Sequence, residues 1–300
     1  MPGTRRVNSG RGHSYLLDGQ KVDGVTTVIG NGIPKPALIN WAAGTIASYV
    51  GERLDVDTTT GHVTADNLVA ALAHVGAKNR YNRWPNDGSF SRLALIETLK
   101  GVHYEDRDRA ANRGTEVHSL AERLVHGDEI DVPEELAGHV DSYIRFLDEW
   151  QVRPVVVEGV CGHRKHRWMG TFDLIADMAG QRWLLDLKTT RSGIFGETAL
   201  QLAAYRHAEF YLDADGNEVP MPDVERVGAV WCRADGYDVI PVVADGGTYR
   251  MFQYAQMVAR FTTWLCREWF GEALLPEVAA LSSSSTAPSS SRPQRGSGLI

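Results

Sequence analysis

The first third of the chain changes from an extended to a helical pattern of apolar residues. Residues 14–30 combine β-branched residues with glycine-containing turns and predict a short β-hairpin. Residues 34–54 carry apolar positions at helical spacing, with Pro36 in a first-turn position, and residues 64–82 repeat a helical pattern. We therefore expect residues 1–105 to form a mainly helical N-terminal extension.

From residue 106 onward, helical and extended patterns alternate, which predicts an α/β core with a mixed central sheet flanked by helices. The expected helices cover residues 106–126, 134–151, 196–212 and 248–270. The expected strands cover residues 154–160, 171–178, 182–190, 226–234 and 237–243. Ala179-Gly180 is short enough to join two of these strands as an antiparallel hairpin. We expect residues 106–275 to form this core and the Ser-rich residues 276–300 to be a disordered tail, because they are too poor in apolar residues to pack.

The composition is that of an ordinary globular protein, with 43% hydrophobic and 23% charged residues. There is no apolar run of about 18 residues that would span a membrane, and the N-terminus lacks the apolar centre of a secretory signal, so we expect a cytoplasmic protein without a membrane partner. The net charge of −7 argues against coating nucleic acid by bulk charge but leaves local DNA binding open. Three widely separated cysteines do not support a disulfide framework or a CxxC-type metal site.

Ionisable residues interrupt two of the most apolar predicted strands. Side chains alternate along a strand, so Asp186 and Lys188 share one face of 182–190, and pairing across the hairpin can set Asp173 near Asp186. Two carboxylates beside an ammonium offer hard oxygen ligands for Mg²⁺ and a cation for a water or a phosphate. An exposed ion pair is the simpler interpretation of an isolated DxK. The apolar context LLDLK instead favours a hydrolytic metal site.

Three residues on predicted helices are candidates to complete this site. Gln201 and Tyr205 are four residues apart, so they share one helical face and can hydrogen-bond a phosphate or the site residues. His118 lies in RGTEVHSLAERL among apolar neighbours, where a histidine is more often a core residue than a ligand. It becomes a third metal ligand if its helix packs over the strand pair.

The densest basic cluster of the chain lies in residues 161–170, between two predicted strands. Beside the metal site it could hold phosphates, with Trp168 stacking on a base, whereas the simpler alternative is a solvated hairpin tip. Glu158, just before the cluster, either binds a second metal ion or pairs with Arg164 or Lys165 at the surface. The candidate DNA contacts are Arg113, Arg164, Lys165, Arg167 and Trp168, with Arg5, Arg6 and Arg11 as weaker candidates.

Four motifs in a fixed order, spanning roughly residues 106–270, resemble the RecB-like branch of the PD-(D/E)XK nuclease superfamily. They are RGTEVH, GTFD at 170–173, LLDLKTT at 184–190 and QLAAY at 201–205, and GVTTVIGNGIPKPALINWA adds a weaker N-terminal match. The resemblance implies a restriction-endonuclease-like core. It also implies roles for individual residues. Mg²⁺, or alternatively Mn²⁺, would be bound by His118, Asp173, Asp186 and the backbone carbonyl of Leu187. Lys188 would position the attacking water, and Gln201 and Tyr205 would complete the site.

The activity implied by this resemblance is a metal-dependent DNA exonuclease that acts at DNA ends in recombination, repair or phage DNA processing, inside a bacterial or phage-infected cell. An endonuclease or structure-specific nuclease with the same residues, and a non-catalytic DNA-binding scaffold, remain alternatives. A single-strand annealing protein or a helicase is a candidate partner. We expect no iron-sulfur cluster, because the chain lacks the four cysteines that hold one in some relatives of this branch.

Overall fold

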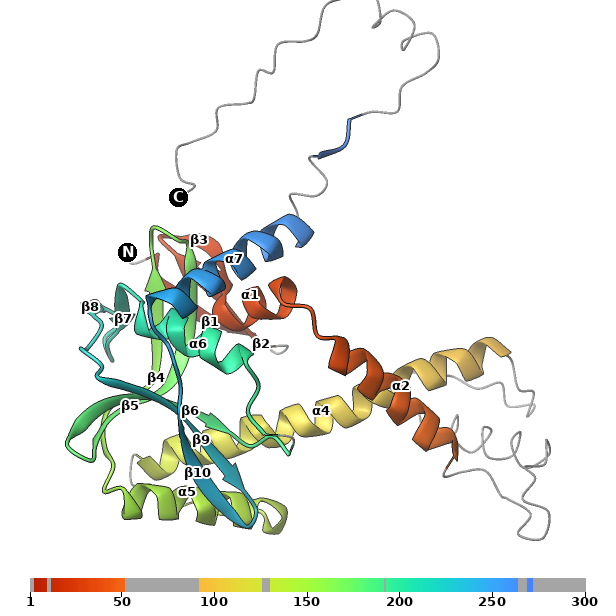
Figure 1. Cartoon of the computed structure of the whole chain (residues 1–300), viewed down its shortest axis with the longest axis horizontal. Coiled ribbons are helices and arrows are strands. Elements are labelled where there is room, and N and C mark those ends of the chain that lie inside the picture. Colours follow the sequence, from red (N-terminus) through yellow and green to blue (C-terminus); the bar gives the residue numbers. More distant parts are fainter. Residues whose placement is uncertain are drawn as a thin grey trace, which may run out of the picture.

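The computed structural model describes residues 3–9, 12–51, 92–125, 130–191, 193–263 and 269–271. These residues form an α/β fold in which helices flank a curled mixed sheet (Figure 1). The α/β class with a mixed sheet, expected from the sequence, is confirmed. The predicted helix over residues 64–82 and the predicted tail over residues 276–300 lie outside the described residues. Within the described ranges, no helix is both long enough and apolar enough to cross a membrane.

The described strands make up a sheet that runs in the order β1-β2-β3-β5-β4-β7-β8, while β6 pairs with β5 and β9, and β9 pairs with β10. The strands are β1 (Arg5–Ser9), β2 (Gly12–Leu17), β3 (Gln20–Gly24), β4 (Arg153–His163), β5 (Trp168–Met178), β6 (Gln181–Lys188), β7 (Phe210–Leu212), β8 (Glu218–Pro220), β9 (Arg226–Arg233) and β10 (Gly236–Pro241). The helices are α1 (Val25–Gly32), α2 (Pro36–Gly51), α4 (Arg92–Val125), α5 (Ala137–Glu149), α6 (Glu197–Arg206) and α7 (Gly246–Thr263), with the 3₁₀ helix η1 (Glu134–Leu136) before α5.

The sheet divides where β5 and β6 separate. The antiparallel β5–β6 ladder runs from the hairpin turn to the pair Leu174↔Leu185 and ends there. Beyond that pair, β5 continues beside β4, and β6 continues in parallel beside β9. Asp173 and Asp186 are the next residues on the two strands, so both lie at the point where the strands part.

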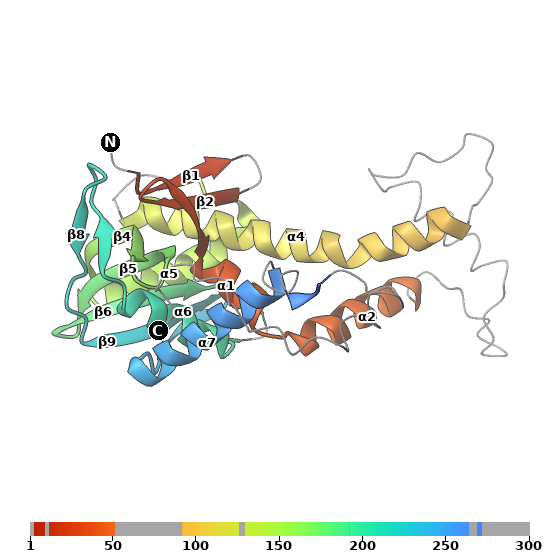
Figure 2. The ribbon, with the colours of Figure 1, turned by 90° about the horizontal axis from the view of Figure 1, so that it is seen from above.

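Most predicted elements are present, with shifted boundaries. The hairpin turn at Ala179-Gly180 is confirmed, with φ values of 51° and 75° that match the left-handed positions of a two-residue hairpin loop. Helix α4 begins well before residue 106 and passes unbroken through residue 105, where the sequence analysis divided the extension from the core. Its N-terminal part extends away from the sheet beside α2 (Figures 1 and 2).

The clearest departure from prediction lies at residues 25–30, the end of the predicted hairpin. The β-branched run from Val25 to Ile29 predicted a strand, but it forms α1. Val25, Val28 and Ile29 are buried in one apolar cluster with residues of α6 and α7. Packing of this helical face therefore outweighs the modest strand preference of β-branched residues.

Two apolar clusters hold the helices against the sheet. One joins α1, α6 and α7 to the sheet through residues such as Leu202 and Phe252, and the other joins α4 and α5 to it through residues such as Val117 and Phe146. Burying each side chain of this size contributes roughly 2 kcal/mol. Helices α4 and α6, which carry the predicted histidine, glutamine and tyrosine of the site, are thereby fixed relative to the strands that carry the acids.

Candidate metal centre

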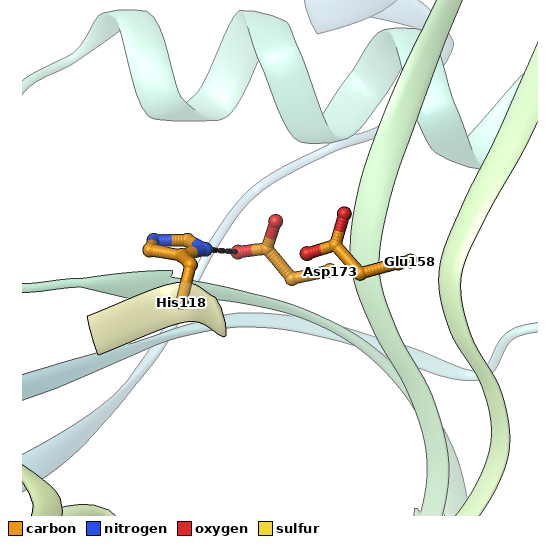
Figure 3. Close-up of side chains that lie close together, drawn as sticks. All are labelled: His118, Glu158 and Asp173. Atoms are coloured by element: carbon orange, nitrogen blue, oxygen red, sulfur yellow. Dashed lines mark ion pairs between the residues drawn. The ribbon is translucent and has the colours of Figure 1, made fainter. Parts of the chain in front are cut away.

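Side chains from three separate elements converge beside the point where β5 and β6 part: His118 from α4, Glu158 from β4 and Asp173 from β5 (Figure 3). One ligand atom from each of them lies within 4.8 Å of the other two. Among the described residues, this is the group of His, Cys, Asp and Glu side chains that has the spacing of a metal site. Carboxylate oxygens with one imidazole nitrogen suit ions such as Mg²⁺ and Mn²⁺.

Asp173 is oriented by a backbone donor and by the imidazole. The backbone N–H of Leu187 donates to its Oδ2 at 2.7 Å, and His118 Nδ1 lies 3.5 Å from the same oxygen. The Leu187 N–H is free to do so because the β5–β6 ladder has already ended. In a strand, the N–H and carbonyl of one residue project toward the same edge, so the Leu187 carbonyl also faces this space.

Glu158 joins the site through an unusual backbone conformation. Its φ of 49° lies in the left-handed region, which costs a non-glycine residue roughly 1–3 kcal/mol. Burial raises the pKa of its carboxyl to about 7, and the negative charge of Asp173 adds to this effect. Its carboxylate forms a long ion pair with Arg6, whose Nη1 lies 4.0 Å from Oε2. A divalent cation would therefore stabilise a carboxylate that the protein alone stabilises poorly.

Asp186 is buried next to this group of side chains, with 2% of its own side chain exposed. Lys188 Nζ lies 2.6 Å from Oδ2, and Gln201 Nε2 donates to Oδ1 at 2.9 Å. Burial raises the pKa of Asp186 to about 6, opposed by the charge of Lys188. Burial disfavours the charge on Lys188, but Asp186 and Asp173 outweigh this effect and hold its pKa above the ordinary value.

The oxygen and nitrogen atoms that this site offers fit a hard divalent cation. Asp186 Oδ2 is buried and makes no hydrogen bond of regular geometry, although the Lys188 ammonium lies beside it. It therefore keeps a lone pair that a cation could use. The sequence predicts Asp186 as a ligand and Glu158 as a less certain one, whereas the structure groups Glu158 with His118 and Asp173. Asp186 instead anchors Lys188 and Gln201 next to the group.

A cavity of about 660 Å³ opens from the centre toward the N-terminal hairpin. Its lining includes His118, Glu158, Asp173, Gln201 and Tyr205. These five residues, all predicted for the site from the sequence, thus lie at the wall of a single cavity. Tyr205 is almost fully buried, and its ring packs closely against Gly170. A Cβ atom at position 170 would lie 2.5 Å from the tyrosine ring.

The basic turn between β4 and β5 contributes Trp168 to the protein interior, while its arginines make contacts at the surface. Trp168 is 0% exposed, and its Nε1 donates to the hydroxyl of Tyr249 on α7 at 3.2 Å. The prediction that Trp168 stacks on a DNA base is therefore wrong, because helix α7 covers the ring. His163, at the end of β4, lies five residues beyond Glu158, about 17 Å along an extended strand.

The arginines of this turn also have partners within the chain. Arg164 pairs with Asp18 and Glu218, which removes the predicted alternative in which Arg164 pairs with Glu158. Arg167 donates to Gln20 at 2.7 Å. These contacts are partly exposed and fasten the turn to the N-terminal hairpin and to β8. Lys165 is exposed, and its predicted contact with DNA stays a prediction.

Arg113 and Arg11 are two other predicted DNA contacts. Arg113 is on α4, close enough to His139 on α5 to add to the effect of burial, which is the main cause that lowers the pKa of that imidazole. Arg11 lies outside the described residues. By contrast, the hairpin of β1 and β2 places Arg6, His13 and Tyr15 at the cavity. His13 and Tyr15 were not predicted for the site, because no local motif marks them and only the folded sheet brings β2 into contact with β5.

Comparisons with known proteins do not identify a family. No family model matches the chain, and no curated protein matches it. Among solved structures, the crystal structure of SSO0001 is similar at 16% sequence identity with a TM-score of 0.26, over 45% of this chain and 62% of that chain. The chain thus spans less than two thirds of the length of that structure. A likeness at this level carries no argument about function, so the interpretation of the site rests on its own residues.

Proposed function

We propose that this chain hydrolyses phosphodiester bonds of DNA with the help of a divalent cation, Mg²⁺ or Mn²⁺. The observation that carries the proposal is the convergence of His118, Glu158 and Asp173 at the end of an open cavity, with the buried Asp186–Lys188 pair beside them. The resemblance of four ordered motifs to RecB-like nucleases supports the same reaction class.

The chemistry needs both a cation and an ordered set of protein groups. A divalent cation held by His118, Glu158 and Asp173 would stabilise the charge that develops on the attacked phosphate and lower the pKa of a water nucleophile. Lys188 holds an ammonium beside the site, where it can donate to the attacking water or to a phosphate oxygen. Gln201 donates to Asp186 and accepts from Lys188 Nζ at 3.5 Å, which limits the positions that the ammonium can take.

The charge of the site makes metal dependence a feature of binding as well as of cleavage. Glu158, Asp173 and Asp186 are all acidic, and Lys188 compensates only one of them directly. Like charges disfavour the approach of a phosphate, and the interaction is strengthened in a partly buried site. We therefore expect DNA to bind the cavity more weakly in EDTA than in a divalent cation that does not support cleavage.

We further propose that cleavage starts at DNA ends, a preference that rests on the sequence resemblance. An endonuclease with the same residues would cut circular and linear DNA alike. The test is digestion of end-labelled linear single-stranded DNA, linear duplex and circular DNA with Mg²⁺, Mn²⁺ or EDTA. Cleavage of the linear substrates alone, only with metal, is the expected result. No cleavage of any of these DNAs with either metal would refute the proposal.

Asp173→Asn isolates the contribution of the centre, because it removes a ligand charge while keeping the size of the side chain. We expect it to abolish cleavage and leave the circular dichroism spectrum unchanged. The matched control is Asp177→Asn, four residues along the same strand, where the carboxylate is half-exposed and pairs with Arg182. This control should cleave at the wild-type rate. Full activity in Asp173→Asn would exclude Asp173 from the reaction.

A further inference from the structure

The hairpin of β1 and β2 forms one wall of the cavity that leads to the metal centre. The volume of about 660 Å³ lies in the usual range for pockets that enclose a small ligand, and one or two nucleotides are molecules of this size. The lining also includes Thr115 from α4 and Thr26 from α1, which add polar groups. A cavity of this size suits one strand of DNA rather than a base-paired duplex.

Arg6 has an unusual position in this wall. Among the described residues that line the cavity, it is the one lysine or arginine. Its side chain is 32% exposed, with Nη1 4.0 Å from Glu158 and Nη2 3.5 Å from His13 Nδ1. Its Nε atom is buried and has no hydrogen-bond partner in the described structure. A guanidinium offers five donors, so these two long contacts leave most of its capacity unused.

The backbone that carries Arg6 is tied to the catalytic strand. Arg6 is opposite Tyr15 in the β1–β2 register, and the Tyr15 hydroxyl is hydrogen-bonded to Thr171 Oγ1 at 2.9 Å. Thr171 lies two residues before Asp173 on β5, hence on the same side of the strand. Tyr15 is 5% exposed, so this link is an interior one. The guanidinium is thus presented from a sheet that is fixed to the metal site and not from a loose chain end.

Arg6 and the metal centre share Glu158. In the absence of a cation, Glu158 is the anion nearest to the guanidinium. A cation bound by Glu158 would draw that carboxylate away electrostatically and leave the guanidinium to another anion in the cavity. The planar guanidinium matches the geometry of phosphate, with two parallel N–H donors.

We propose that Arg6 binds a backbone phosphate of a single DNA strand in this cavity, next to the phosphate at the metal centre. The inference rests on the proposed function and extends it, because it names a single strand as the occupant of the cavity and the N-terminal hairpin as part of the substrate site. His13 and Tyr15 then act as positioning residues that hold the hairpin against β5.

The test is the salt dependence of binding to a fluorescein-labelled single-stranded oligodeoxynucleotide, followed by anisotropy with Ca²⁺ in place of Mg²⁺ to prevent cleavage. Each phosphate neutralised on a single strand contributes about −0.7 to the slope of log K against log salt concentration. Arg6→Gln should make this slope less steep by about 0.7 and weaken binding roughly tenfold at low salt. In cleavage assays it should raise KM far more than it lowers kcat.

Arg5→Gln is the matched control, since Arg5, a weaker candidate for DNA contact from the sequence, precedes Arg6 on the same strand, is exposed and does not line the cavity. It should leave the slope and KM unchanged. Arg6→Lys keeps the charge without the fork, so it should retain the slope while binding more weakly, which separates phosphate contact from loss of fold. A wild-type slope in Arg6→Gln, or equal effects of Arg5→Gln and Arg6→Gln, would overturn the inference while wild-type cleavage still supports the proposed function. A wild-type chain that neither cleaves nor binds DNA would overturn both.

Discussion

Replacing Lys188 by methionine should leave the fold with a buried, uncompensated carboxylate. Asp186 is 2% exposed and its Oδ2 has the Lys188 ammonium 2.6 Å away. Methionine keeps much of the apolar stem of lysine and removes the charge. Breaking a buried ion pair from one side costs about 3–5 kcal/mol, because the remaining charge has lost its partner in a region of low dielectric. Lys188→Met should therefore be destabilised at pH 8, without metal, by about 3 kcal/mol, the low end of this range.

The loss of stability in Lys188→Met should increase as pH rises. Burial already raises the pKa of Asp186 to about 6 in the folded wild type, above its unfolded value of about 3.9. A carboxyl of this kind stabilises the fold at low pH, and that stability is lost as pH rises through the folded pKa. Without Lys188, the folded pKa of Asp186 rises further. Wild type and variant should thus be similar in stability near pH 5, where both carry a neutral Asp186, and diverge above pH 6 by up to about 1.4 kcal/mol per pH unit.

A double-mutant cycle tests this reasoning. Asn at position 186 keeps an oxygen that accepts the Gln201 amide, which lies 2.9 Å from Oδ1 in the wild type. Asp186→Asn combined with Lys188→Met removes both charges, so the pair of changes should cost about 1 kcal/mol or less. The measurement is urea unfolding of all four proteins in EDTA at pH 5 and pH 8. Additive losses, or a Lys188→Met loss that is the same at both pH values, would refute the buried-pair account.

Two further predictions concern packing and protonation. Gly170→Ala should destabilise the fold by about 1–3 kcal/mol, because the new Cβ would lie 2.5 Å from the Tyr205 ring. The control is Gly114→Ala, where the atom nearest to the new Cβ lies 3.7 Å away. Equal urea midpoints for the two variants would contradict the prediction. Burial, aided by the charge of His166 and opposed by Glu209, lowers the pKa of His163 to about 4. The unfolded state then binds more protons than the folded one between about pH 4 and 6.5, so the stability of the fold should rise with pH across this window. His163→Gln should flatten this rise. An unchanged pH profile of stability in that variant would contradict the lowered pKa of His163.

The parts of the fold that the sequence predicts well are those set by local patterns. The β5–β6 hairpin follows from alternation of apolar residues and from a two-residue turn that needs positive φ at Ala179 and Gly180. Alternation also puts Asp186 and Lys188 on one face, and the structure brings Lys188 Nζ to Asp186. These features depend on residues close together in the chain, so they could be predicted without knowledge of the tertiary structure.

The parts that could not be predicted depend on contacts between distant residues. From the sequence, Trp168 is predicted to be an exposed turn residue. In the structure, its indole N–H donates to the hydroxyl of Tyr249 on α7, 81 positions further along the chain. The proposed ligand role of Glu158 depends on a left-handed backbone at a residue type that rarely adopts it. Likewise, the helical state of Val25 to Ile29 depends on burial against α6 and α7. No local pattern contains this information.

The end of the β5–β6 ladder explains why the unfavourable features of the chain gather at one place. A ladder that continued past Leu174↔Leu185 would bond the Leu187 N–H to backbone and leave no space between the two acids. Because it ends, the N–H bonds Asp173, Asp186 becomes buried without a regular partner for Oδ2, and the strained Glu158 turns toward the gap. The last two of these features, the buried Asp186 oxygen and the strained backbone of Glu158, cost stability in the isolated chain. A divalent cation would relieve the charge on all three acids at once, so it should raise the unfolding temperature of the wild type and have little effect on that of Asp173→Asn.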